Sequence, residues 1–315
     1  MWRALCLVME LVLKDEFLNR IRLLMGEEMD VFIEYCRKPL PTTIRVNTIK
    51  ISKNELLRKL GARYTLEPIP WYADAFIVRD GFSLGNTLEH VLGYFYIQEA
   101  ASMIPPLILA PKENEWVLDL CAAPGSKATQ IAQLMRNTGL LIANDVRIDR
   151  IKPLVANLQR CGVTNCIVTM MDGNLFREVR LSFDKVLVDA PCSSEGAIRK
   201  DFKIAKMWNP KMILKLSRLQ KKLIATGFMR LKEGGRLVYS TCTLAPEENE
   251  EVVDFLLKKY ENAEIEKIGL KGLKFREGIV EWKGKRYDDE VRHCMRIYPQ
   301  DNDTEGFFVA SIIKK

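Results

Sequence analysis

From residue 115 onward, short apolar runs alternate regularly with segments of helical character, such as 126–137, 147–162 and 210–231. Strands that are apolar throughout and alternate with helices indicate a parallel sheet covered on both faces, so we expect an α/β domain. The predicted strands are 115–120, 139–145, 166–172, 185–191 and 236–243. A final antiparallel hairpin is predicted at 291–299 and 306–315.

The residues before this alternation predict a smaller α+β module. Its predicted elements are a helical region at 10–37, a strand at 43–51, a helix at 52–61, a strand at 75–80 and a helix-like bridge at 94–109. Ser52 is the expected N-cap of the second helix, and the bridge is expected to end near Pro105 and Pro106. We therefore expect an N-terminal module over 1–110 and a main domain over 111–315.

The composition excludes several classes of protein. No apolar run reaches the roughly 18 residues that span a bilayer, and the first residues show no cleavage site of a signal peptide, so we expect a cytoplasmic protein without a membrane segment. Eight cysteines in 315 residues are too few for a disulfide scaffold. The presence of only two histidines, His90 and His293, argues against a zinc site and weakens any Ser-His-Asp interpretation, so no metal is expected.

The positive charge is concentrated in one segment. Residues 1–110 carry no net charge, whereas 199–222 hold nine basic residues with Asp201 as the one acid. Lys211, Lys215, Arg218 and Lys222 recur at steps of four, three and four, on the side of a predicted helix opposite its apolar residues. Such a row is either a solvated helix face or a surface for a phosphate backbone. We refer to these four residues as the basic stripe.

Four predicted strands end in, or closely follow, an aspartate: Asp119, Asp145, Asp172 and Asp189. One such carboxylate alone could merely cap the next helix. Because ligands of open α/β sheets bind beyond the carboxyl ends of the strands, four at one sheet edge favour a ligand site.

The turn after the first strand, "CAAPGSK", indicates the kind of ligand. It consists of Cys121, Ala122, Ala123, Pro124, Gly125, Ser126 and Lys127, and it lacks the G-x-G-x-x-G pattern of dinucleotide-binding proteins. Gly125 permits close approach of a ligand to the backbone, Lys127 suits a ligand carboxylate, and Asp145, 20 residues after Gly125, suits ribose hydroxyls. S-adenosylmethionine fits this pattern better than a nicotinamide dinucleotide. Asp172 is a candidate for the adenine amino group, and Arg150 for the ribose or Asp145.

The motifs "CAAPGSK" (121–127), "DAPCS" (189–193) and "TCT" (241–243) together closely resemble the Sun/nucleolar-protein family of RNA cytosine-5 methyltransferases. "RVNT" (45–48) and "EGFFVASI" near the end extend the resemblance over about 15–315. It implies a Rossmann-like, seven-stranded class I S-adenosylmethionine-dependent domain after an RNA-recognition-like module. The layout is most similar to compact archaeal tRNA cytosine-5 methyltransferases. A tRNA substrate is therefore expected, with rRNA as the alternative, and a monomer without extra RNA-binding domains.

The chemistry of this family explains why cysteines are needed. Carbon 5 of cytosine is a weak nucleophile until a thiolate adds to carbon 6. By resemblance, Cys242 is this nucleophile, Cys192 resolves the adduct, and Asp189 contacts the cytosine and lines the cofactor pocket. Pro246 and the acids after it are expected to start the next helix.

Three other interpretations remain open at this point. A strand-end cysteine is often an inert buried thiol. A non-catalytic RNA-binding protein could keep the fold, but Cys242 and Asp189 are both present. A DNA or amino-methylating enzyme fits less well, since the former uses the Pro-Cys cysteine for attack and the latter would show an Asn/Asp-Pro-Pro-aromatic turn.

Overall fold

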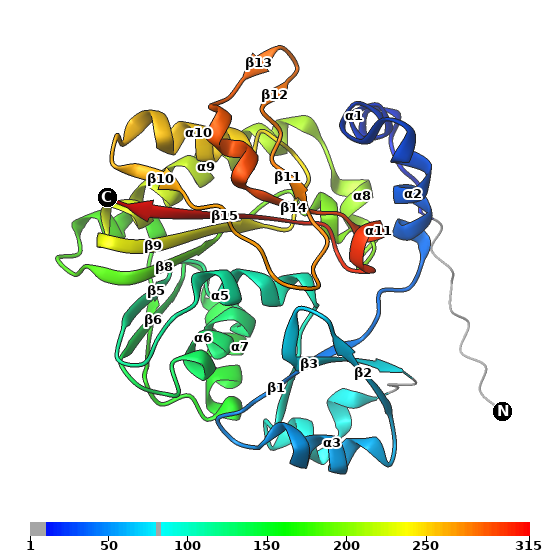
Figure 1. The fold of residues 1–315 in the computed structure, drawn as a ribbon, viewed down its shortest axis with the longest axis vertical. Helices are drawn as coiled ribbons and strands as arrows, with labels where there is room; N and C mark the ends of the chain where they lie inside the picture. The colour runs from blue at the N-terminus through cyan, green and yellow to red at the C-terminus, as the bar shows by residue number, and fades with distance from the viewer. Residues whose placement is uncertain (1–10, 80–82) are drawn as a thin grey trace.

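A computed structural model describes residues 11–79 and 83–315, so residues 10 and 80 of two predicted elements lie outside the described part. The described chain contains a large twisted sheet with the strand order β11-β14-β15-β9-β8-β5-β6-β7, in which β10 also pairs with β15 (Figure 1). Its five parallel strands are β5 (Trp116–Asp119), β6 (Leu140–Asp145), β7 (Cys166–Met170), β8 (Phe183–Asp189) and β9 (Leu231–Thr241). All five predicted strands are confirmed.

The last strands complete the sheet in the antiparallel direction. Strand β15 (Phe307–Lys314) runs antiparallel to both β9 and β14 (Met295–Ile297), which confirms the predicted hairpin. The short α11 (Pro299–Asn302) lies in its connection. Two further strands, β10 (Ala263–Ile265) and β11 (Arg276–Glu277), extend the sheet beyond seven strands, and β12 (Glu281–Trp282) pairs with β13 (Lys285–Arg286) as a separate hairpin.

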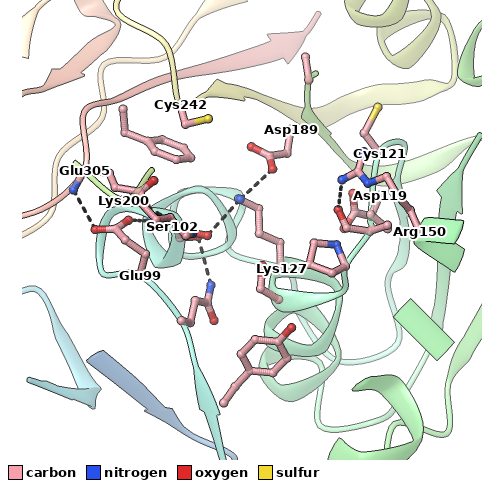
Figure 2. Close-up of a pocket in the computed structure, with 18 of the residues that line it drawn as sticks. Glu99, Ser102, Asp119, Cys121, Lys127, Arg150, Asp189, Lys200, Cys242 and Glu305 are labelled. Carbon is pink, nitrogen blue, oxygen red and sulfur yellow. Dashed lines mark hydrogen bonds and ion pairs between the residues drawn. The ribbon is translucent and has the colours of Figure 1, made fainter. Parts of the chain in front are cut away.

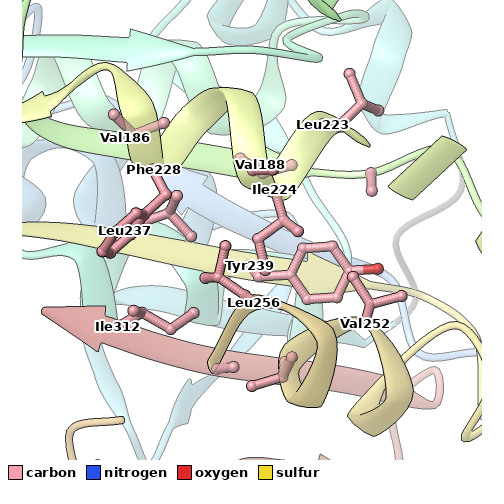
Figure 3. Packing of buried hydrophobic residues seen from close by; sticks show 14 of the residues in the cluster. Val186, Val188, Leu223, Ile224, Phe228, Leu237, Tyr239, Val252, Leu256 and Ile312 are labelled. Carbon is pink, nitrogen blue, oxygen red and sulfur yellow. The ribbon is translucent and has the colours of Figure 1, made fainter. Parts of the chain in front are cut away.

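Helices cover both faces of this sheet, as the apolar strands predict. One face carries α5 (Ile104–Leu109), α6 (Ser126–Leu134) and α7 (Ile148–Cys161), and the other carries α9 (Pro210–Met229) and α10 (Glu250–Lys259). In Figure 3, Ile224 and Phe228 of α9 lie against the side chains of β8 and β9. Burial of each such side chain contributes about 1.5–3 kcal/mol, so this cluster fixes the strands that carry the candidate site.

The N-terminal module has its own four-stranded sheet, in the order β2-β3-β1-β4. The strands are β1 (Thr43–Val46), β2 (Thr65–Ile69), β3 (Tyr72–Arg79) and β4 (Phe95–Ile97). Helix α3 (Lys53–Gly61) shares a hydrophobic cluster with this sheet, and the module also contains the short α4 (Leu88–Val91). The predicted helix cap is present, since the Ser52 hydroxyl accepts a hydrogen bond from the Glu55 N–H at 3.3 Å. Strand β1 is shorter than predicted.

The predicted helix-like bridge at 94–109 is wrong in its first half. Residues Phe95–Ile97 form β4, a 3-10 turn follows at Ala101–Met103, and α5 begins only at Ile104. Pro105 and Pro106 stand at the start of α5 rather than at its end. Proline has no N–H to donate, and the first turn of a helix is where that donor is not needed.

The predicted helical region at 10–37 is divided into α1 (Asp15–Met25) and α2 (Met29–Arg37), because Gly26 adopts a positive φ of 58° between them. These helices pack on the main domain. Phe17 of α1 meets the buried Trp208, which follows α8 (Lys203–Met207), with ring centroids 5.3 Å apart. In the described residues, no helix is both long and apolar enough to cross a membrane.

Candidate active site

The two motif cysteines meet at the carboxyl ends of neighbouring strands. Cys192 follows β8 and Cys242 follows β9, and these strands are parallel with Asp189 opposite Ser240. The two Sγ atoms lie 3.3 Å apart, and both cysteines are half-buried. The sequence therefore predicted correctly that both strand ends reach one place.

The two thiols are not equivalent. The pKa of Cys242 is lowered, first because the Cys192 thiol donates a hydrogen bond to its sulfur, and this outweighs the effect of burial. The pKa of Cys192 is raised well above its ordinary value, by the same hydrogen bond and then by burial. The Ser194 hydroxyl lies 3.5 Å from the Cys242 sulfur. Cys242 is thus the thiol that ionises first, as a nucleophile must.

Asp189 lies at the end of β8 and holds two partners. Its Oδ2 accepts a hydrogen bond from Lys127 Nζ at 2.8 Å, and its Oδ1 accepts one from the Ser240 hydroxyl at 2.8 Å. Although burial acts to lower it, the pKa of Lys127 is raised, because the charge of Asp189 favours the ammonium form. Lys127 was expected to face a ligand carboxylate. In the structure it pairs with Asp189, since a buried ammonium requires a counter-charge, and its contact with a ligand carboxylate stays a prediction.

A cleft of about 350 Å³ opens in front of these groups (Figure 2). Of the predicted residues, those that line it are Cys121, Ala122, Ala123, Pro124, Ser126, Lys127, Arg150, Asp189 and Cys242. The predicted residues outside its lining are Gly125, Asp145, Asp172 and Cys192.

The predicted cofactor turn is shaped by its contact with α7. Gly125 has a φ of +106°, and a Cβ there would lie 3.1 Å from Leu154 Cδ1, so both conformation and space favour glycine. Asn157 donates its side-chain N–H to the Pro124 carbonyl at 2.9 Å, and Arg150 donates to the Ala123 carbonyl. These bonds hold the turn open toward the cleft.

Two buried carboxyl groups at the strand tips fit a cofactor. Asp119 is fully buried, and neither of its carboxyl oxygens has a hydrogen-bond partner. Burial, and then the nearby Asp189, raise the pKa of Asp119 to about 8. Asp145 Oδ2 has no hydrogen-bond donor and lies 3.4 Å from Arg150 Nη1. Buried acceptors without donors match the ammonium and ribose hydroxyls of S-adenosylmethionine.

Asp172 occupies a different environment. It follows β7, is exposed, and its Oδ1 accepts hydrogen bonds from the N–H and the side-chain amide of Asn174. It caps a short 3-10 helix at Gly173–Glu178. Helix capping is the structural role that an aspartate at a strand end can have without binding a ligand. Its proposed contact with adenine stays a prediction.

Another group in the cleft, formed by Glu99, Lys200 and Glu305, was not predicted from the sequence. Glu99 Oε1 accepts a hydrogen bond from the Glu305 N–H at 3.1 Å, and Lys200 lies 3.4 Å from Glu305. Burial, and then Glu99, raise the pKa of Glu305 to about 7. These residues are far apart in the chain, so no spacing rule could have joined them. Ser102, which accepts a hydrogen bond from Lys127 at 3.1 Å, was also missed.

The sheet order, the turn after β5 and the unpartnered acids at the strand tips together define a class I S-adenosylmethionine-dependent methyltransferase. Comparison with known proteins is more specific. Residues 106–313 match the family model described as 16S rRNA methyltransferase RsmB/F, and residues 13–100 match the N-terminal domain of 16S rRNA methyltransferase RsmF. The chain belongs to this RsmB/F family, which is also known as the Sun family, so the predicted family is confirmed.

Individual relatives agree with this assignment. A tRNA (cytosine(49)-C(5))-methyltransferase of Pyrococcus abyssi is 50% identical over 91% of this chain and 93% of its own. A ribosomal RNA small subunit methyltransferase F of Shewanella oneidensis is 44% identical over 91% of this chain, but the match covers only 60% of that longer protein. The chain is thus an S-adenosylmethionine-dependent RNA cytosine-5 methyltransferase, as predicted.

Solved structures confirm the fold. A methyltransferase homologue from Pyrococcus horikoshii superposes with a TM-score of 0.85 at 37% identity and covers 94% of both chains. NSun6 from Pyrococcus horikoshii, solved with SFG, gives a TM-score of 0.82 at 26% identity, over 96% of this chain and 98% of its own.

Proposed function

We propose that the enzyme methylates carbon 5 of cytosine in tRNA through a covalent bond between Cys242 and carbon 6 of the base. The observation that carries this proposal is the contact of the Cys192 and Cys242 sulfurs beside the cleft that the "CAAPGSK" turn lines. An inert pair of core thiols would not be expected to lie beside an open cleft with the pKa of one thiol lowered and that of the other raised.

The proposed reaction begins with the Cys242 thiolate. Its electron pair forms the S–C6 bond, the C5=C6 pair becomes available at carbon 5, and ring nitrogen N3 takes up a proton. Asp189 is proposed to hold N3 and the amino group of the base, and its own Oδ2 accepts a hydrogen bond from Lys127. When bound, the cofactor would supply an electrophilic methyl group for carbon 5, and its sulfur would keep the electron pair of the broken S–CH3 bond. Loss of the carbon 5 proton to a base then restores the C5=C6 double bond, N3 gives up the proton it took, and the S–C6 pair returns to Cys242.

Cys192 is proposed to assist this release. Its pKa is raised, so it carries its proton when Cys242 is a thiolate, and it can donate a hydrogen bond to the departing sulfur. Such a bond stabilises the charge that develops on Cys242 as the S–C6 bond breaks.

The proposed cofactor residues are those of the turn 121–127 together with Asp145, Arg150, Asp172 and Asp189. Asp119 joins them, because its buried, unpartnered carboxyl group needs a donor such as the ammonium of the cofactor. Asp172 is proposed to bind the adenine amino group, and the only support for this role is its position after β7.

We propose tRNA rather than rRNA as the substrate because of how much of each relative's length this chain covers. The chain spans 93% of the archaeal tRNA enzyme but 60–64% of the small-subunit rRNA enzymes. Its basic stripe offers a phosphate-binding surface, since Lys211, Lys215, Arg218 and Lys222 are all exposed. The target base must be unstacked to reach the cleft, so the enzyme should act on locally opened RNA.

Bisulfite sequencing of total RNA that has been incubated with the protein and S-adenosylmethionine tests the substrate. We expect protected cytosines at defined positions in tRNA. Protection confined to rRNA would replace the proposal by its alternative. No protection in either RNA would favour the non-catalytic RNA-binding protein.

Three further proposals concern organisation. The N-terminal module is proposed to span 1–110 and the catalytic domain 111–315. The enzyme is proposed to work as a monomer, which light scattering would test, and in the cytoplasm. In the described residues, no group of three or more His, Cys, Asp or Glu side chains is arranged to hold a metal, and the proposed reaction uses none.

A further inference from the structure

A buried carboxyl group lies directly behind the two cysteines. Ser193 follows Cys192 in the chain, Thr243 follows Cys242, and both hydroxyls reach Glu248. Ser193 donates its backbone N–H to Glu248 Oε2 at 3.0 Å and its hydroxyl to Oε1. The Thr243 hydroxyl lies 3.4 Å from Glu248 Oε1 and 2.7 Å from the Ser193 hydroxyl.

A third segment meets the same carboxyl group. Gln220 of α9 donates its side-chain N–H to Glu248 Oε2 at 2.8 Å and to the Pro191 carbonyl at 2.9 Å. Glu248 and Gln220 are both fully buried. One carboxyl group therefore joins the segment of Cys192, the segment of Cys242 and the helix that covers both strands.

The sequence assigned Glu248 to the start of a helix, and the structure corrects this. Helix α10 begins at Glu250, and Glu248 lies in the preceding turn, where its side chain points inward. Burial raises the pKa of Glu248 to about 7, against the opposing hydrogen bonds from Ser193 and Gln220. A helix-capping or surface role would not require a buried acid, so its presence here calls for a different explanation.

We propose that Glu248 is a positioning residue, whose carboxyl group sets the contact between the Cys192 and Cys242 sulfurs by binding the residue that follows each cysteine. This inference rests on the proposed roles of the two cysteines. The physical reason is geometric, because the two sulfurs can share a proton only while the loops that follow β8 and β9 stay at a fixed distance from each other. A misplacement of about 1 Å can lower the rate roughly 10²-fold.

Glu248→Ala and Glu248→Gln together test the proposal. Glutamine can still accept the bonds from the Ser193 N–H and Gln220 on its oxygen, and its NH2 group can donate to the Ser193 hydroxyl, so it should preserve the spacing. Alanine removes every hydrogen bond to the carboxyl group and leaves the direct bond between the Ser193 and Thr243 hydroxyls near it. A bifunctional thiol reagent that fluoresces only after both arms have reacted reports the spacing directly, and Cys192→Ala gives its background.

For Glu248→Ala we expect a cross-linking rate at least about tenfold lower and a kcat lower by roughly 10²-fold, with the KM for RNA little changed. For Glu248→Gln we expect both rates within about threefold of the parent. Cross-linking and kcat that stay at parent values in Glu248→Ala would overturn the proposal.

Two further variants keep the test decisive. Ser193→Ala removes one hydroxyl link but keeps the backbone N–H, so it should fold even if Glu248→Ala does not, and it should lower cross-linking in the same direction. Leu60→Ala, in the buried core of the N-terminal module, controls for a general loss of stability. Slower cross-linking with unchanged methyl transfer would support the position of Glu248 but refute the proposed roles of the cysteines.

Discussion

The sulfur atoms of Cys192 and Cys242 lie 3.3 Å apart, although the residues are 50 positions apart in the chain. Strands β8 and β9 are parallel neighbours, and the registry of Asp189 with Ser240 places the residues that follow them side by side. At this distance one thiol donates and the other accepts. This asymmetry supports the proposed division of steps between two cysteines at similar strand ends, with attack by Cys242 and release assisted by Cys192.

Substitution of the two cysteines should give opposite products. Cys242→Ala should abolish methyl transfer, because no thiolate can add to carbon 6 of cytosine. In Cys192→Ala, Cys242 should still add to the base and the methyl group should still be transferred. Release of the RNA from Cys242 should be slowed, so a covalent protein–RNA adduct should accumulate. Denaturing gel electrophoresis with labelled RNA measures the adduct.

Cys166→Ala, which removes a half-buried thiol away from the cleft lining, is the matched control and should turn over normally. If Cys192→Ala turned over normally while Cys242→Ala trapped RNA, the assigned roles would be reversed.

The reactivity of Cys242 should depend on its neighbour. The hydrogen bond from Cys192 is the main cause that lowers the pKa of Cys242, so its removal in Cys192→Ala should raise that pKa. The pH profile of Cys242 alkylation, followed by mass spectrometry of the modified peptide, should therefore move to higher pH. A profile that stays in place would show that Cys192 does not stabilise the thiolate.

Binding of the cofactor should release a proton near neutral pH. The pKa of Asp119 is raised to about 8, so this carboxyl group is mostly protonated at pH 7 in the free protein. A cofactor ammonium beside it favours the ionised form, and binding should expel close to one proton and tighten as pH rises from 7 to 8. Titration calorimetry in buffers of different ionisation enthalpy measures this.

In Asp119→Asn the proton release should disappear and the affinity should fall at pH 8. Asp184→Asn is a suitable control, because Asp184 lies at the other end of β8 and pairs with Lys232. Equal proton release by the parent and Asp119→Asn would place the titrating group elsewhere.

Removal of positive charge from the basic stripe should lower the affinity for RNA and make that affinity less dependent on salt concentration. Removal of one lysine that binds a phosphate should reduce the slope of log K against log salt by about 0.7–0.9. Lys215→Gln should show this change with a modest decrease in affinity. The control variant is Lys112→Gln, because Lys112 is exposed just before β5, at the amino-terminal end of that strand. Its salt slope should equal that of the parent. Identical slopes for both variants would mean that the stripe is only a solvated helix face.

The catalytic motifs could be predicted from the sequence because each is local. Strand-end positions of Asp189, Cys192 and Cys242 follow from apolar periodicity, and parallel strands must bring their carboxyl ends to one sheet edge. The turn with Gly125 was recognisable for the same reason. The N-terminal module was harder. β4 was mistaken for part of a helix, because its three residues are too few for a period to be read.

The sequence alone determined the fold, the family and the strand-end positions of the two cysteines, since these depend on short-range patterns and motifs. The tertiary structure decided the environment of each charge. Lys127 pairs with Asp189, Asp119 is left without a partner, and Glu248 lies behind both cysteines rather than on a helix. Burial and contacts between distant segments set these environments, and no local pattern of residues encodes them.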